Sequence, residues 1–197
     1  MFVLKIKENN SKSIVRLTGK SIKGGKVIVF PTDTVYGLIA DAANKKAVEK
    51  IFKMKKRAKE KPLPIFVKDI KMAKKFAYIN KDQVDFLKKS WPGKITAVLK
   101  RKPSKTKIYG LDEKTIALRV PKYKLITELF KRTNFPLAET SVNISNQPPI
   151  TEIKEIVKHF KKIKLQPDLI IDAGNLKPSK PSTVIDLTQK KPKILRE

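Results

Sequence analysis

Hydrogen-bonding side chains are concentrated in the stretch FPTDTVYGL at residues 30–38, which directly follows the apolar run KVIV. Thr32, Asp33, Thr34 and Tyr36 bring hydroxyl and carboxylate groups to the end of an expected strand, and Gly37 allows a tight backbone. This combination predicts a site for a small polar ligand. Threonine and aspartate are also common turn residues, so a polar turn that bonds its own backbone is the alternative.

Three further clusters of polar side chains follow along the chain. In KMKKRAKEK (53–61), Arg57 and Lys61 stand near the end of an expected helix, where they can bind phosphates or form a solvated charged face. Small hydroxyl and amide side chains flank strands in ETSVNIS (139–145) and KPSTVID (180–186), namely Ser141, Asn143, Ser145, Ser182 and Thr183. They can face a ligand or cap their own loops.

Several common catalytic arrangements are absent from the sequence. It has no cysteine, which excludes disulfides, thiolate nucleophiles and thiolate metal sites. GGK at 24–26 lacks the other residues of a P-loop, and there is no Gly-x-Gly-x-x-Gly or HExxH motif. The single histidine, His159, follows Glu155 by four residues on an expected helix, which predicts a surface pair. The sequence therefore offers no cysteine nucleophile and no promising histidine base.

The elements that must position these residues are predicted by short apolar runs and amphipathic stretches. Strands are expected at 26–30, 62–67, 95–101, 115–120, 135–140, 168–172, 182–187 and 193–195. Helices are expected at 44–57, 69–79, 81–89, 124–132 and 151–163. Strands and helices mix without strict alternation, and no repeat or linker divides the chain. We therefore expect an α/β fold in one domain over 1–197, an open, twisted, mixed sheet with flanking helices.

The charge balance is extreme, since 46 lysines and arginines face 18 acidic residues and give a net charge of +28. Such a charge favours a polyanionic partner, either RNA or a nucleotide. Only six of the basic residues are arginines, however, and lysines are spread along the whole chain, so a lysine-rich composition explains the charge equally well. No apolar run approaches the ~20 residues of a membrane helix and the N-terminus has no signal-peptide pattern, so the cytoplasm is the expected compartment.

The order of the motifs carries more information than any one of them. FPTDTVYGL, KKRAKEKPL, WPGKIT (91–96), TIALRVP (115–121), TSVNIS, PSTVID and ILR (194–196) together resemble the YrdC-like family of threonylcarbamoyl-AMP synthases over nearly the whole chain. The resemblance implies an open twisted α/β sheet with a basic concave face. It also implies a nucleotidyltransferase that condenses L-threonine, bicarbonate and ATP into threonylcarbamoyl-AMP and pyrophosphate. A separate transferase then forms threonylcarbamoyladenosine in tRNA.

The resemblance further implies roles for individual residues. Threonine would be bound by Thr34, Tyr36, Arg119 and Ser182, with Arg119 on the threonine carboxylate. ATP would be bound by Lys55, Arg57, Lys61, Thr115, Ser141, Asn143 and Arg196, the first three at its phosphates. Mg²⁺ is expected to bind through the ATP phosphates rather than at a metal site of the protein. No side chain is assigned as a catalytic acid or base.

The chain departs from the family pattern at several positions. Lys94 stands where proline is usual after WPG, Phe66 where many members have histidine, Val142 where alanine is common and Asn146 where glycine is common. The change at Asn146 is mild, because asparagine also tolerates a positive φ. The main alternative function is a basic module that binds double-stranded RNA or tRNA without catalysis. A synthase acting on another substrate and an inactive paralogue are further alternatives.

Overall fold

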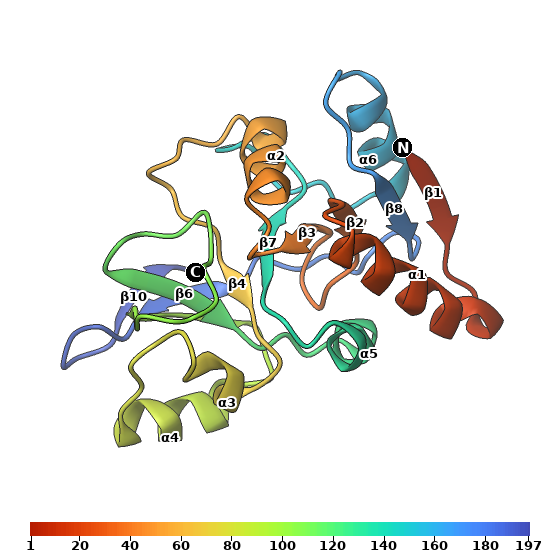
Figure 1. Cartoon of the computed structure of the whole chain (residues 1–197). Coiled ribbons are helices and arrows are strands. Elements are labelled where there is room, and N and C mark those ends of the chain that lie inside the picture. The colour runs from red at the N-terminus through yellow and green to blue at the C-terminus, as the bar shows by residue number, and fades with distance from the viewer.

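The computed structural model describes residues 1–197 as one ten-stranded sheet with helices on both faces (Figure 1). The strands are β1 (Phe2–Lys5), β2 (Ile28–Phe30), β3 (Gly37–Asp41), β4 (Ile65–Phe66), β5 (Ile95–Lys100), β6 (Thr115–Arg119), β7 (Leu137–Ser141), β8 (Leu169–Asp172), β9 (Thr183–Asp186) and β10 (Lys193–Arg196). The helices are the 3₁₀ turn η1 (Glu8–Asn10), α1 (Ser11–Lys23), α2 (Lys45–Lys55), α3 (Ile70–Ala73), α4 (Lys81–Ser90), α5 (Lys124–Thr133) and α6 (Ile153–Lys161).

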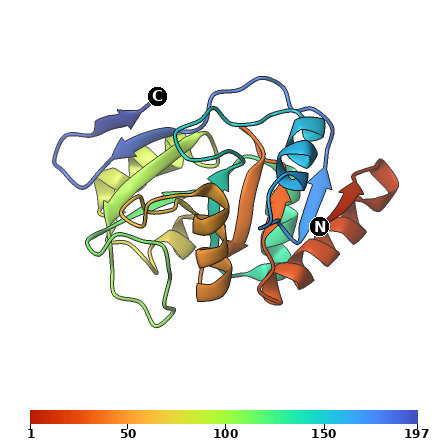
Figure 2. The same cartoon turned by 90° about the horizontal axis from the view of Figure 1, so that it is seen from above.

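The sheet is mixed and open, which confirms the predicted fold class. Its strand order is β1-β8-β2-β3-β7-β4-β6-β5-β9-β10, so β1 and the β9–β10 hairpin stand at opposite ends (Figures 1 and 2). The pairs β1–β8, β8–β2, β4–β6 and β5–β9 are parallel, and the other neighbours are antiparallel. In Figure 1, α2 and α6 lie on one side of the sheet and α3, α4 and α5 on the other. None of the helices is long and apolar enough to cross a membrane.

Besides the short turn η1, three elements were not predicted from the sequence. The strand β3 begins at Gly37, and glycine is disfavoured in strands. Its next three residues are nevertheless buried and pair with β2 and β7. The strand β1 is exposed and pairs only at the sheet edge with β8. The helix α1 buries Thr18 and Gly19 beside Ile14, Val15 and Ile22, and these two residues hide its apolar pattern.

The predicted helix at 69–79 was wrong beyond its first turn. Asp69 caps α3 by accepting a hydrogen bond from the Met72 amide (2.7 Å), but the helix ends at Ala73. The chain then leaves the helix to pair with the end of β5, through a bridge between Ala77 and Arg101 and a bond from the Tyr78 amide to the Lys100 carbonyl (2.9 Å). Sheet pairing thus overrides a helical apolar spacing, because it satisfies these backbone groups with tertiary partners.

The register of the central strands decides which side chains share a face. Phe66 on β4 stands opposite both Arg119 on β6 and Leu137 on β7. Directly opposite residues point to the same face and alternate residues along a strand do too, so Glu139 and Ser141 join this face. Ile65, Leu118 and Ala138 point to the other face, and residues from both faces, Phe66 and Leu137 included, belong to one contiguous core of 44 buried residues.

Candidate functional site

A cavity of about 500 Å³ lies on the face that carries Arg119 and Glu139, between the sheet, the end of α2 and the loop after β7. It collects most of the predicted site residues: Thr34, Lys55, Arg57, Arg119, Ser141, Asn143, Ser182 and Arg196. These residues are far apart in the sequence and come mainly from the ends of strands and helices. The separate polar motifs therefore converge on one hollow, as the sequence predicted.

Arg119 is held at one end of the cavity by groups of the protein. Its Nη2 donates to Asp33 Oδ1 (2.6 Å), its Nε to the Gly93 carbonyl (3.0 Å) and its Nη1 to Thr34 Oγ1 (3.4 Å). The Arg119 side chain is 3% exposed and that of Asp33 8%, and the guanidinium also lies over the Phe66 ring. A guanidinium carries five N–H groups, so Arg119 retains donors for a ligand carboxylate.

The FPTDTVYGL stretch forms a polar turn that bonds its own backbone, and it also contributes a side chain to the cavity. Thr32 bonds its own turn, since its Oγ1 donates to the Val35 carbonyl (2.7 Å) and accepts from the Thr34 amide (3.1 Å). Asp33 and Thr34 instead contact Arg119, and Thr34 lines the cavity. The stretch is thus a self-bonded turn that presents Thr34 to the site.

Lys55 is buried at the end of α2 and organises the loop after β7. Its ammonium donates to the Ser141 carbonyl (2.6 Å), the Asn143 carbonyl (3.1 Å) and Asn143 Oδ1 (2.7 Å). Burial lowers the pKa of Lys55 to about 8, and the nearby Arg57 acts in the same direction. All three ammonium protons are used within the protein, so Lys55 fixes the geometry of Ser141 and Asn143 in this structure.

A cationic rim borders the cavity where the chain leaves α2. The Arg57 Nε donates to the Lys61 carbonyl (2.7 Å) and its Nη2 to the Pro62 carbonyl (2.9 Å). The Lys61 ammonium reaches Asn146 Oδ1 (3.1 Å) and so bridges the two loops at the rim. Asn146 has φ 69°, which agrees with the expectation that asparagine replaces a glycine here without difficulty.

The last strand of the sheet closes the opposite side of the cavity. The Arg196 Nη2 donates to the Ser182 carbonyl (2.6 Å), and the Ser182 hydroxyl shares a hydrogen bond with Thr96 (2.8 Å). Burial lowers the pKa of Arg196, as it does that of Arg57, and neighbouring arginines add to the effect. Cationic groups that face one another in this way are suited to an anionic ligand.

Glu139 was missed by the sequence reasoning, although it is the only acidic residue that lines the cavity. Burial raises its pKa to about 7, against the opposing effects of Arg119, Lys55 and Arg196. A lone acid within the short strand LAETS gave no motif to recognise. The period-two alternation was the available signal, because it places Glu139 on the same strand face as the recognised Ser141.

Three predicted site residues, Tyr36, Lys61 and Thr115, do not line the cavity, although Lys61 lies at its rim. The Tyr36 hydroxyl donates to the Gly174 carbonyl (2.7 Å) and accepts from the Ala173 amide (2.9 Å), and burial raises its pKa to about 12. The Thr115 hydroxyl donates to Asp112 Oδ1 (2.9 Å) at the start of β6. Thr115 shares the strand face of Arg119 but stands roughly 13 Å along the strand from it.

We expect Tyr36→Phe to lower the free energy of unfolding by about 1–3 kcal/mol, because two backbone groups after β8 lose their partner. The Michaelis constant for a substrate bound in this cavity should stay within about twofold of the parent, since Tyr36 does not line the cavity. Urea unfolding and saturation kinetics measure the two quantities. A large rise in that constant without loss of stability would show that the hydroxyl does contact the substrate.

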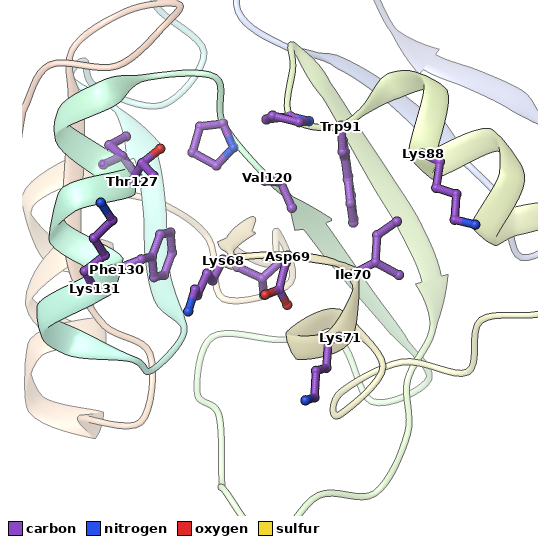
Figure 3. A pocket seen from close by; sticks show the side chains of 14 residues that line it. Lys68, Asp69, Ile70, Lys71, Lys88, Trp91, Val120, Thr127, Phe130 and Lys131 are labelled. Carbon is purple, nitrogen blue, oxygen red and sulfur yellow. The ribbon is translucent and has the colours of Figure 1, made fainter.

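A second cavity, of about 570 Å³, lies on the opposite face of the sheet between α5 and the α3–α4 pair (Figure 3). Ile70, Trp91, Val120 and Phe130 surround it, and the Lys71 and Lys88 side chains extend away from it (Figure 3). Its one carboxylate, Asp69, is used as the cap of α3. The polar groups that could orient a substrate do not converge here, so the first cavity is the candidate site.

Comparison with known proteins identifies the family. The family model for Sua5, YciO and YrdC proteins, described as "Telomere recombination", matches residues 20–197. A Methanocaldococcus jannaschii relative, provisionally named as a threonylcarbamoyl-AMP synthase, is 37% identical over 196 residues, which are 99% of this chain and 90% of the relative. The threonylcarbamoyl-AMP synthase of Pyrococcus abyssi is 33% identical over 98% of this chain and 56% of its own length.

Solved structures give the same result. The crystal structure of P. abyssi Sua5 complexed with L-threonine matches with a TM-score of 0.88 and 32% identity, over 100% of this chain and 57% of that one. Escherichia coli YciO matches with a TM-score of 0.85 and 26% identity, over 100% of this chain and 94% of that one. This chain thus spans little more than half of the Pyrococcus protein but nearly all of YciO and of the Methanocaldococcus relative. On the sequence match and the shared fold together, the chain belongs to the Sua5/YciO/YrdC family.

Proposed function

We propose that the chain is a threonylcarbamoyl-AMP synthase, which condenses L-threonine, bicarbonate and ATP into threonylcarbamoyl-AMP and pyrophosphate. The observation that carries the proposal is the convergence of Thr34, Lys55, Arg57, Arg119 and Arg196 on one cavity. The naming of the Pyrococcus relative as such a synthase, and the L-threonine in its crystal structure, support the same reading. The activity of the longer Pyrococcus protein extends to this shorter chain as part of the proposal.

The cavity offers separate groups to the two substrates. Arg119 would bind the threonine carboxylate, with Thr34 and Ser182 beside the amino acid. Arg57 and Lys61 would bind the phosphates at the rim, while Ser141, Asn143 and Arg196 would contact the nucleotide. Thr115 lies outside the cavity and bonds Asp112, so it is left out of this set. Tyr36 would act indirectly, by holding the loop after β8. Two anionic reactants need cations to bring them together, which this set supplies.

The reaction requires positioning and charge stabilisation more than acid–base catalysis. Threonine's amine and bicarbonate give a carbamate, and a carbamate oxygen attacks the α-phosphorus of ATP while pyrophosphate leaves. Cations aimed at the phosphates stabilise the charge that develops on the leaving group. No cluster of three or more His, Cys, Asp or Glu side chains is placed to hold a metal ion. As part of the proposal, the ATP phosphates and water would hold Mg²⁺, which would offset the phosphate charge.

We expect Arg57→Ala to lower the rate of pyrophosphate formation about 10- to 100-fold, because one charge-assisted phosphate contact is worth roughly 1.5–3 kcal/mol. Lys59→Ala, an exposed change in the same loop, is the matched control and should behave as the parent. Initial rates at several ATP concentrations provide the measurement. A parental rate for Arg57→Ala would remove Arg57 from the phosphate site.

Omission of each substrate in turn tests the proposed function. Pyrophosphate release should require ATP, L-threonine and bicarbonate together, and serine or alanine should replace threonine poorly. Release of pyrophosphate without threonine, or none with all three substrates present, would contradict the proposal. The product would supply a tRNA-modifying transferase, and we expect the reaction to take place in the cytoplasm.

The net charge of +28 favours a second candidate, direct binding of tRNA or double-stranded RNA. Such binding could accompany catalysis or occur without it. A binding module without catalysis would release no pyrophosphate, and its affinity for RNA should fall steeply as salt concentration rises. RNA binding measured from 50 to 200 mM salt, beside the omission assay, separates the two functions.

A further inference from the structure

The carboxylate of Glu139 has an unusual position in the cavity. It lies over Gly37, where an added Cβ would stand 2.7 Å from Glu139 Oε1, and so reaches the backbone just beyond the Thr34 turn. Glu139 is half-buried, and its carboxylate makes no hydrogen bond or ion pair within the protein. The protein thus presents an unpaired acceptor to the hollow where the amino acid is proposed to bind.

The cations around Glu139 are committed to other groups. Arg119 pairs with Asp33, Lys55 bonds the loop after β7, and Arg196 bonds the Ser182 carbonyl. Asp33, in the turn after β2, is the negative group near Glu139. Its positive neighbours are Lys55 on α2, Arg57 just beyond α2, Arg119 on β6 and Arg196 on β10. Their positive field offsets part of the cost of burying the carboxylate but gives it no direct partner. A cationic group of a ligand would complete its coordination.

We propose that Glu139 binds the α-ammonium group of the amino-acid substrate and accepts its proton, so that the free amine can attack the one-carbon donor. This inference rests on the proposed function and names a catalytic residue within it. A zwitterionic amino acid carries its carboxylate and ammonium on the same carbon. Arg119 for the carboxylate and Glu139 for the ammonium form a clamp of opposite charges across that carbon.

The proton balance of the step is complete. The α-ammonium gives one proton to the Glu139 carboxylate, and the resulting amine attacks the carbon of bicarbonate. As the C–N bond forms, the C–OH bond breaks, and the second amine proton leaves with hydroxide as water. The carbamate keeps one negative charge for attack on ATP, and Glu139 returns its proton to solvent. A carboxyl group with a pKa of about 7 is suited to this exchange near neutral pH.

Glu139→Gln tests the proposal because it preserves shape and removes the charge. We expect the dissociation constant of L-threonine to rise at least about tenfold, and pyrophosphate formation to fall about 10²- to 10⁴-fold. The parental rate should rise with pH through about 7, as Glu139 loses its proton, and the variant should lack this dependence. Glu155→Gln, an exposed change on α6, is the control and should match the parent.

A ligand without the ammonium group gives a readout independent of turnover. The parent should bind 2,3-dihydroxybutyrate, in which a hydroxyl replaces the ammonium, at least about tenfold more weakly than L-threonine, and Glu139→Gln should lose this preference. If Glu139→Gln fails to fold, Glu139→Asp replaces it and should keep the preference while turning over more slowly.

The outcomes separate this inference from the proposed function. A parent that forms no pyrophosphate refutes the synthase, whereas an active parent with an equally active Glu139→Gln refutes the role of Glu139. A variant with a lower melting temperature but unchanged threonine binding and pH dependence would also overturn the proposal. Glu139 would then only balance the positive charge of the cavity.

Discussion

Arg119→Ala is expected to abolish measurable saturation by threonine and to lower the free energy of unfolding by about 3–5 kcal/mol. The stability loss follows from Asp33, whose side chain is 8% exposed and would remain as a buried charge without its partner. The loss of saturation follows from the N–H groups that Arg119 does not use within the protein, since Arg119 lines the cavity where the threonine carboxylate is proposed to bind. Urea unfolding and threonine-dependent pyrophosphate release measure the two effects separately.

A double variant distinguishes binding from folding. Arg119→Met with Asp33→Asn removes both charges, so it should recover much of the lost stability, since a buried ion pair can be replaced at little cost. It should still fail to saturate with threonine. If either folded variant saturates with threonine at parental concentrations, Arg119 does not bind the substrate carboxylate.

Lys55→Met is expected to have the second-largest effect, a loss of about 2–4 kcal/mol in stability together with at least about a hundredfold loss of activity. The ammonium makes three hydrogen bonds to Ser141 and Asn143, and their oxygens would lose their partner in a partly buried loop. Because the loop would no longer be fixed, the groups proposed to face the nucleotide would lose their positions.

Hydrogen exchange provides the check on this explanation. The Ser145 amide donates to the Lys55 carbonyl (2.9 Å), and this amide should exchange faster in Lys55→Met than in the parent. Lys53→Met, an exposed change on the same helix, is the matched control. Full activity with an unprotected Ser145 amide would show that catalysis does not need the ordered loop, and lost activity with a protected amide would show that Lys55 acts in another way.

The sequence was sufficient for the fold class and for most strands, because buried runs such as 168–172 have few alternatives. It failed where tertiary pairing decides the structure. The β3 strand forms because β2 and β7 bond it on both sides. The predicted helix at 69–79 ends at Ala73, because the chain goes on to pair Ala77 with Arg101. Neither partner is visible in a local window of residues.

The candidate site was predictable to the extent that it is built from recognisable motifs. Arg57, Arg119, Ser141 and Ser182 were found from ordered motifs, and they line one cavity. The motifs did not reveal the hydrogen-bond partners of these groups. The Lys55 ammonium bonds the loop after β7, and the Tyr36 hydroxyl bonds the backbone after β8. Such details depend on which acceptor lies nearest in space, and sequence spacing does not contain that information.

The most direct measurement of the central claim is mass spectrometry of the product formed from ATP, L-threonine and ¹³C-bicarbonate. The account predicts threonylcarbamoyl-AMP carrying one labelled carbon, in equal amount with pyrophosphate, and its loss in Arg119→Ala. A folded parent that forms no such adduct, or one that releases ADP and phosphate instead, would contradict a single cavity that joins the amino acid to the nucleotide.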